Sequence, residues 1–161
     1  MRGMRGALLL GLAAGFVGGC GNTEPQDPPL NTVVQVSSKG TDGVVPVGST
    51  GIGVSVPPGA LAQDAFLTAT PLASQAAVGS PSPGSDSFIT GLEFGSSITP
   101  LARPVQLQVP LPQPVPVGTA ISVFQQNGAT LQPVTVVNSP GTFVPFSTSR
   151  TGRFFFALRS P

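Results

Sequence analysis

Cys20, the single cysteine of this chain, is the residue best placed to do chemistry. It follows two arginines near the start, Arg2 and Arg5, and an apolar run over residues 7–17. Two glycines stand directly before it. A positive start, an apolar run and small residues are the pattern of a secretory signal peptide and its cleavage site. The apolar run is too short to span a bilayer, which needs about 20 residues. We therefore expect the protein to be exported.

The order Val17-Gly18-Gly19-Cys20 resembles the lipobox of bacterial lipoprotein signal peptides. The resemblance implies that the chain is cleaved between Gly19 and Cys20 and that the Cys20 thiol carries acyl chains. Residue 21 is Gly, whereas Asp after the cysteine is the familiar inner-membrane retention signal of Gram-negative lipoproteins. The resemblance thus implies a lipid anchor in the cell envelope, and the outer membrane is the expected destination.

Three regions follow from this pattern. Residues 1–19 are the expected lipoprotein signal peptide. Residues 20–31 hold the lipidated cysteine and a polar, proline-rich stretch without a hydrophobic period, which we interpret as a short flexible tether. Cleavage would leave 142 of the 161 residues. This length suits one domain, which we place over residues 32–161.

The composition excludes several kinds of chemistry. The chain has no His, Trp or Tyr, so it lacks the commonest metal ligand and general base and two residue types favoured at binding hot spots. Loss of Arg2 and Arg5 with the signal peptide would change the net charge from +1 to −1. The remaining basic residues are scattered along the chain, so no nucleic-acid partner is expected. They are Lys39, Arg103, Arg150, Arg153 and Arg159.

Two small groups of residues could still form a site. Lys39 follows Ser37 and Ser38, and a serine–lysine pair is one arrangement that activates a nucleophile. No pocket or oxyanion donor accompanies the pair in the sequence, so we interpret it as a solvated turn. Asp42 and Asp86 are the least implausible ligands of a calcium site built from separate loops, although the acidic residues match no calcium-loop spacing. We predict a domain that is not an enzyme and holds no metal or cofactor.

Short apolar runs dominate the chain beyond the tether. Segments rich in Val, Ile, Thr and Phe alternate with clusters of Gly, Pro, Ser and Asn, and no segment has the apolar spacing of a helix. This rhythm is typical of all-β proteins, and we predict an antiparallel β-sandwich. The predicted strands cover residues 32–37, 43–47, 51–56, 66–70, 88–94, 105–109, 120–125, 130–137, 142–146 and 153–158.

Alternation within these strands predicts which side chains face the core. Three sets of residues are expected to share a face: Ile52, Val54 and Val56; Val105, Leu107 and Val109; and Phe88, Leu92 and Phe94, with Ile89 and Glu93 opposite. Asn127-Gly128 predicts a tight hairpin that joins strands 120–126 and 129–134, because this pair accepts positive φ at both turn positions. The prolines of 110–116 predict an extended crossover between the sheets, with a recognition segment as the alternative. We interpret residues 154–158 as a final core strand.

Two stretches go beyond the general pattern of a β-sandwich: residues 54–61 followed by 66–71, and residues 94–97 running into 103–110. Together they resemble the ZU-five domain, a module of zonula occludens proteins, netrin receptors, ankyrins and some bacterial exported lipoproteins. The likeness is good over residues 43–110 and only architectural over 111–158. Ser96, Ser97 and Leu101 depart from the usual pattern, so the loop at 95–101 is expected to differ in shape. The residues that match the family motif are Pro57, Gly59, Ala60, Leu61, Gly95, Pro104 and Val105.

The resemblance implies a structural role for these residues and a function in protein–protein contacts. Some eukaryotic relatives cut themselves at His-Phe-Ser, and the nearest match here is Pro145-Phe146-Ser147. Because the assisting histidine is missing, we expect Ser147 to be an ordinary strand residue. We predict a membrane-anchored envelope lipoprotein whose sandwich binds an unknown protein partner or has a structural role. A calcium- or glycan-binding adhesion module is the alternative interpretation.

Overall fold

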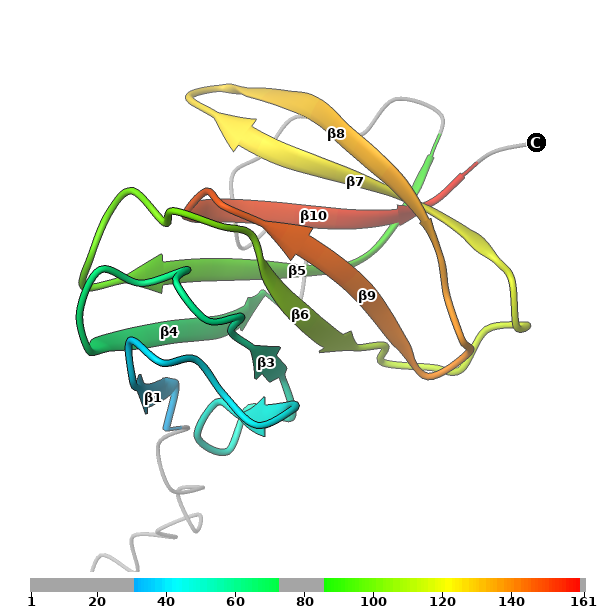
Figure 1. Cartoon of the computed structure of the whole chain (residues 1–161). Helices are drawn as coiled ribbons and strands as arrows, with labels where there is room; N and C mark the ends of the chain where they lie inside the picture. The colour runs from blue at the N-terminus through cyan, green and yellow to red at the C-terminus, as the bar shows by residue number, and fades with distance from the viewer. Residues whose placement is uncertain (1–30, 73–85, 160–161) are drawn as a thin grey trace, which may run out of the picture.

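Ten β-strands provide the regular structure of residues 31–72 and 86–159, which are the residues that the computed structural model describes (Figure 1). Within these ranges the fold is all-β. The strands are β1 (Val33–Val36), β2 (Val45–Pro46), β3 (Gly53–Ser55), β4 (Ala65–Leu72), β5 (Ser87–Ser96), β6 (Val105–Pro110), β7 (Ala120–Asn127), β8 (Thr130–Asn138), β9 (Phe143–Thr148) and β10 (Gly152–Leu158).

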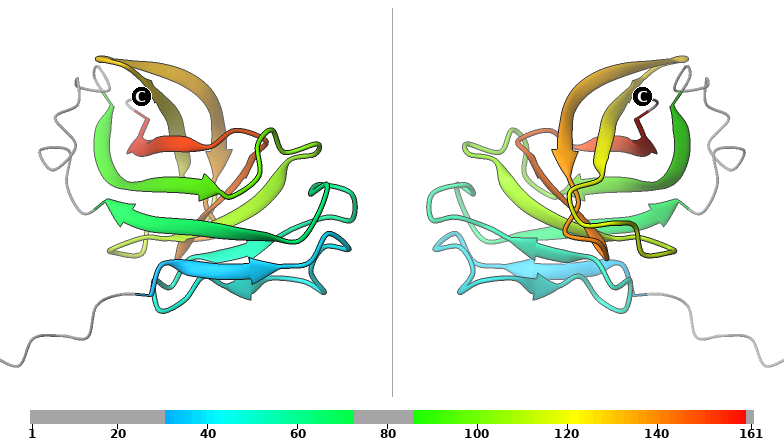
Figure 2. Two further views of the ribbon diagram at one scale, coloured as in Figure 1. Left: turned by 90° about the vertical axis from the view of Figure 1, so that its left-hand side faces the viewer. Right: turned by 90° about the vertical axis from the view of Figure 1, so that its right-hand side faces the viewer.

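The strands form two antiparallel sheets, and the prediction of an antiparallel β-sandwich is confirmed (Figure 2). A six-stranded sheet has the order β1-β4-β5-β10-β7-β8, and a four-stranded sheet has the order β2-β3-β6-β9. The two sheets differ in width, so the smaller one cannot cover the whole face of the larger one. β8 and β9 are the last strands of their sheets.

All ten predicted strands are present, with differences at their ends. One such difference is at β2, which is confined to two residues where the sequence predicted residues 43–47. Gly43 has a φ of 85°, which is not a strand conformation, and the N–H of Val47 donates to Ile52 O at 2.9 Å across a tight connection. Turns at both ends therefore shorten this strand.

The core lies between the two sheets, where alternating residues face inward. The predicted inward sets of β3 and β6 and their flanks are all buried: Ile52, Val54, Val56, Val105, Leu107 and Val109. The two sheets meet through phenylalanine rings. The ring of Phe146 in β9 lies 4.9 Å from that of Phe154 and 5.8 Å from that of Phe156, both in β10. β10 lies between β5 and β7, which confirms the predicted final core strand.

The predicted inward set of β5 is wrong at one position. Phe156 pairs with Thr90 and the next residue pairs with Phe88, so Ile89 is an extra residue in β5. Such a bulge reverses the alternation beyond it. Ile89 consequently packs against the core, whereas the Phe88 ring lies 6.1 Å from that of Phe155, which is outside the core cluster.

Two predicted connections are confirmed, one with a shift. A tight hairpin joins β7 and β8, but Asn127 pairs with Thr130, so the two turn residues are Gly128 and Ala129. Gly128, with a φ of 59°, supplies the left-handed conformation at the first turn position.

The chain over 111–119 crosses from the small sheet to the large one, as predicted. It runs beside residues 139–142, with a bond of 2.8 Å from Val115 N–H to Gly141 O.

Candidate functional site

The residues of the family motif form a tight turn and its supports. The N–H of Ala60 donates to Pro57 O at 3.1 Å, and Gly59 has a φ of 75°. This is the third position of a type II turn, which requires positive φ. Ala60 and Leu61 follow the turn and are buried in the core. This segment is therefore a sharp turn that carries two apolar residues into the core.

The connection between β5 and β6 holds this turn in place. Ala102 N–H donates to Ala60 O at 2.9 Å, and Arg103 Nη1 donates to Pro58 O at 3.3 Å. Pro104 directly precedes β6, and Val105 is the fully buried first residue of that strand. These contacts join segments that are far apart in the sequence, so their role is structural.

Gly95 allows two strands to approach. It lies opposite Thr68 in the β4–β5 ladder, and a Cβ at residue 95 would collide with the Thr68 hydroxyl. β5 continues to Ser96, so the loop expected over residues 95–101 begins later than predicted. The residues of the family motif therefore shape turns and strand contacts, and none of them belongs to an arrangement that could do chemistry.

The candidate serine–lysine pair lies in the connection between β1 and β2. Ser37 Oγ accepts a hydrogen bond from the Lys39 backbone N–H at 3.3 Å, and Asp64 accepts one from the Ser38 N–H at 2.8 Å. The bond from Ser38 holds the pKa of Asp64 below its usual range, and the nearby Lys39 charge adds to this effect. Within the described residues, neither serine hydroxyl bonds to the Lys39 amine. The arrangement is that of a hydrogen-bonded surface turn.

The two candidate calcium ligands lie in different parts of the fold. Asp42 is in the connection that follows β1, whereas Asp86 lines a cavity of about 340 Å³ with residues of β7 and β8. β1 and β8 are at opposite edges of that sheet. Within residues 31–72 and 86–159, no three Asp, Glu, Cys or His side chains come together to hold a metal ion.

Of the other candidate residues, one lies within the described part of the chain and two lie outside it. Ser147 lies within β9, opposite Gln106, and is exposed. Gly19 and Cys20 lie outside the described residues, so the lipid site and cleavage site stay predictions. No helix in the described part of the chain is long and apolar enough to cross a membrane.

The feature that the sequence did not reveal is the side of the sandwich between β8 and β9. Nearly every residue of β8 is exposed, and Val134 and Val136 are each 46% exposed. Val134 has no partner in the β7–β8 ladder, because the register shifts there, and it lines a cavity together with residues of β9. No local pattern indicated this, since residues 130–137 have the composition of an ordinary hairpin strand.

β8 and β9 diverge from their common connection (Figure 1). Residues of both strands, together with residues of β6, line a cavity of about 480 Å³ that we call the β8–β9 groove. Its lining combines apolar side chains with amide and hydroxyl groups and contains no charge. The lining residues are Val44, Gln106, Leu107, Gln108, Val134, Thr135, Val137, Pro145, Phe146 and Ser147.

Comparison with models of known protein families and with curated proteins gave no match for this chain. The likeness to the ZU-five domain is therefore carried by the sequence motif alone. The β8–β9 groove, which needs no relative to be recognised, is the candidate binding surface.

Proposed function

We propose that this protein is an exported lipoprotein, anchored in the cell envelope through acylated Cys20, whose β-sandwich binds another protein and catalyses no reaction. The observation that carries the interaction role is the open β8–β9 side of the sandwich. There an exposed, uncharged strand borders a groove of about 480 Å³. Soluble domains ordinarily limit such surfaces, so one that is present suggests a partner.

The lipid anchor is supported by the sequence around Cys20. One acyl chain gives only marginal membrane binding, and stable anchoring needs a second signal. A lipoprotein with two or three chains on Cys20 meets this need. Residue 21 is Gly, which favours the outer membrane as the destination in a Gram-negative cell. The short tether would keep the sandwich near the membrane surface.

The anchor is tested by intact mass and membrane fractionation of the full-length protein beside Cys20→Ala. We expect the wild type to be cleaved, acylated and membrane-bound, and the variant to lack acyl chains. A matched variant, Gly21→Asp, should keep the lipid and move toward the inner membrane. A soluble wild type with a free thiol would contradict the proposal.

The interaction role is tested in intact envelopes with a photo-crosslinking amino acid at Val134 or, for comparison, at Phe66. Both side chains are exposed, at 46% and 52%, but only Val134 lines the groove. We expect a crosslinked protein adduct of reproducible mass from position 134. If neither position gives an adduct, the interaction role is wrong.

A further inference from the structure

We propose that the β8–β9 groove and its continuation to Arg150 bind an extended polypeptide segment that carries an acidic side chain, which pairs with Arg150. This inference rests on the proposed interaction function and adds the surface and the chemistry of the partner. It is carried by three adjoining cavities, by the charge of their lining and by the strand edges beside them.

The groove continues along the molecule through two smaller cavities. One of about 210 Å³ shares Val134 and Ser147 with the β8–β9 groove. The next, of about 310 Å³, shares Gln125, Ser149 and Arg150 with the one before it. The three cavities thus form a row that starts over β6 and β9 and ends at the turn between β9 and β10. A row of cavities fits an extended ligand better than a compact one.

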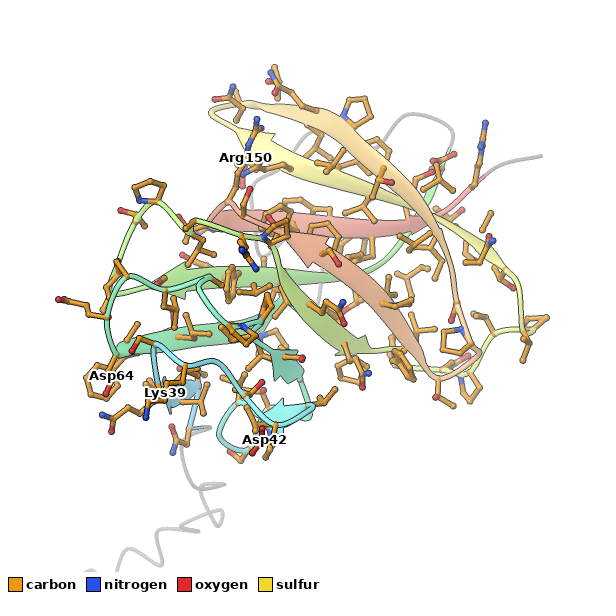
Figure 3. All side chains as sticks on the ribbon, viewed as in Figure 1. Lys39, Asp42, Asp64 and Arg150 are labelled. Atoms are coloured by element: carbon orange, nitrogen blue, oxygen red, sulfur yellow. The ribbon has the colours of Figure 1, made fainter. Side chains whose placement is uncertain are left out.

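Arg150 is the only charged residue among the described residues that line these three cavities. Its guanidinium forms no ion pair or hydrogen bond with the described residues. Arg153, by comparison, is paired with Glu93 at 3.2 Å. Figure 3 places Arg150 at the end of the molecule away from Lys39 and the acidic Asp64. A neutral groove with one unpaired arginine is complementary to a neutral chain with one negative charge.

The backbone of Arg150 is fixed before any ligand arrives. The Thr148 hydroxyl accepts a hydrogen bond from Arg150 N–H at 2.9 Å and donates one to Arg150 O at 3.0 Å. The Gln125 amide donates to Thr151 O at 3.3 Å, which ties the same turn to β7. A guanidinium can form two parallel hydrogen bonds with a carboxylate, and on a fixed turn this pairing needs no further ordering of the backbone.

The remaining lining favours a polypeptide as the occupant. Gln106, Gln108 and Thr135 offer amide and hydroxyl groups that match the donors and acceptors of a peptide main chain. Nucleic acid is usually held by base stacking on aromatic rings together with several basic residues, whereas Phe146, the one aromatic residue that lines the β8–β9 groove, is buried and the groove lining carries no charge. The carboxylate is then that of an Asp or Glu side chain, because Arg150 lines both of the last two cavities and the last one extends to Thr99 and Pro100, which leaves room for a peptide on either side of Arg150.

The same surface is poorly suited to a second copy of this chain added as a strand. β8 pairs only with β7, and β9 pairs only with β6, so each has an edge without a strand partner among the described residues. Pro133 and the bulge at Val134 interrupt one edge, and Pro145 interrupts the other. Proline has no N–H to donate, so neither edge supports a long ladder. We therefore expect the groove to bind its partner through side-chain contacts and not through strand addition.

The test is selection of displayed random dodecapeptides on the purified full-length protein in detergent. We expect the recovered peptides to be enriched in Asp or Glu at one position. Synthetic copies should bind Arg150→Gln about 10- to 100-fold more weakly than the wild type, the effect of a lost charge-assisted bond. Replacing the acidic residue of the peptide by its amide should produce a similar loss, and the two losses should not add.

Two variants control this measurement. Lys39→Gln removes a positive charge from a residue that lines none of the three cavities, and it should leave binding unchanged. Val134→Asp places a negative charge in the groove and should weaken binding at least as much as Arg150→Gln, while melting temperature checks that both variants remain folded. Equal binding to wild type and Arg150→Gln, or selected peptides without acidic enrichment, would overturn the inference. Envelope crosslinks from Phe66 but none from Val134 would also overturn it and leave the interaction function standing, whereas crosslinks from neither position would remove both.

Discussion

Two valine-rich segments of this molecule, β3 with its flanks and β8, have opposite environments. Val54 and Val56 are buried, whereas Val134 and Val136 are each 46% exposed. β3 lies between β2 and β6 and is covered by the larger sheet, while β8 is the last strand of a six-stranded sheet opposite one of four. The difference teaches that the position of a strand in the sheet and the face on which a valine lies decide which valines enter the core, since Val137 of β8 does pack against it. The uncovered strand is where we place function.

The largest effect is expected from a phenylalanine inside the sandwich. Phe156 is fully buried, and Phe66 in the same sheet is 52% exposed. Phe156→Ala should lower the free energy of unfolding by about 3–5 kcal/mol, because it leaves a cavity between the sheets. Phe66→Ala should cost about 0.5 kcal/mol or less. Urea unfolding midpoints compare the two variants, and similar shifts would show that the core does not lie where we describe it.

The two valine environments are compared directly by one substitution. Val54→Thr places a hydroxyl in the core without a partner and should cost about 1–3 kcal/mol. Val136→Thr leaves its hydroxyl in water, so its effect should stay within about 0.5 kcal/mol. Chemical denaturation with a constant m-value is the measurement. A loss at Val136 as large as that at Val54 would mean that β8 is covered in the folded protein.

A smaller effect is expected at the turn that follows β3. Gly59 has a φ of 75°, and a residue with a Cβ is strained there. Gly59→Ala should lower the unfolding free energy by about 1–2 kcal/mol. Gly59→Asn should lose less, because asparagine adopts this conformation more readily. Melting temperatures of the two variants give the ranking, and the reverse order would argue against the type II turn.

The smallest effect is expected at Asp64. Its pKa is lowered mainly by the hydrogen bond from Ser38 N–H, so the folded state favours the ionised carboxylate. A lowered folded-state pKa stabilises the protein above the unfolded-state pKa of about 3.9, and the contribution is lost as the pH falls through the folded-state value. Asp64→Asn should therefore melt slightly below the wild type at pH 7, with the difference vanishing toward pH 2. A difference that grows in acid would contradict the assignment.

Local sequence patterns predicted much of the fold. All ten strands lie where runs of β-branched and aromatic residues occur between turn residues, and the inward sets of β3 and β6 follow from strict alternation. The turn at Pro57–Ala60 was also predictable, because a type II turn needs positive φ at its third position and glycine adopts that conformation readily. The absence of histidine restricts the possible chemistry through composition alone.

Pairing between strands, some of them far apart in the sequence, determined the bulges and the row of cavities. The bulges at Ile89 and Val134 arise from ladders with β10 and β7, and each reverses which side chains face inward beyond it. The same pairing placed Gln125, Val134 and Arg150 along one row of cavities, although they lie on β7, on β8 and in the turn before β10. The alternation of apolar and polar residues is a property of neighbouring residues, so it can be read from the sequence. A groove depends on which strands lie at the edges of each sheet, and only the tertiary packing determines that.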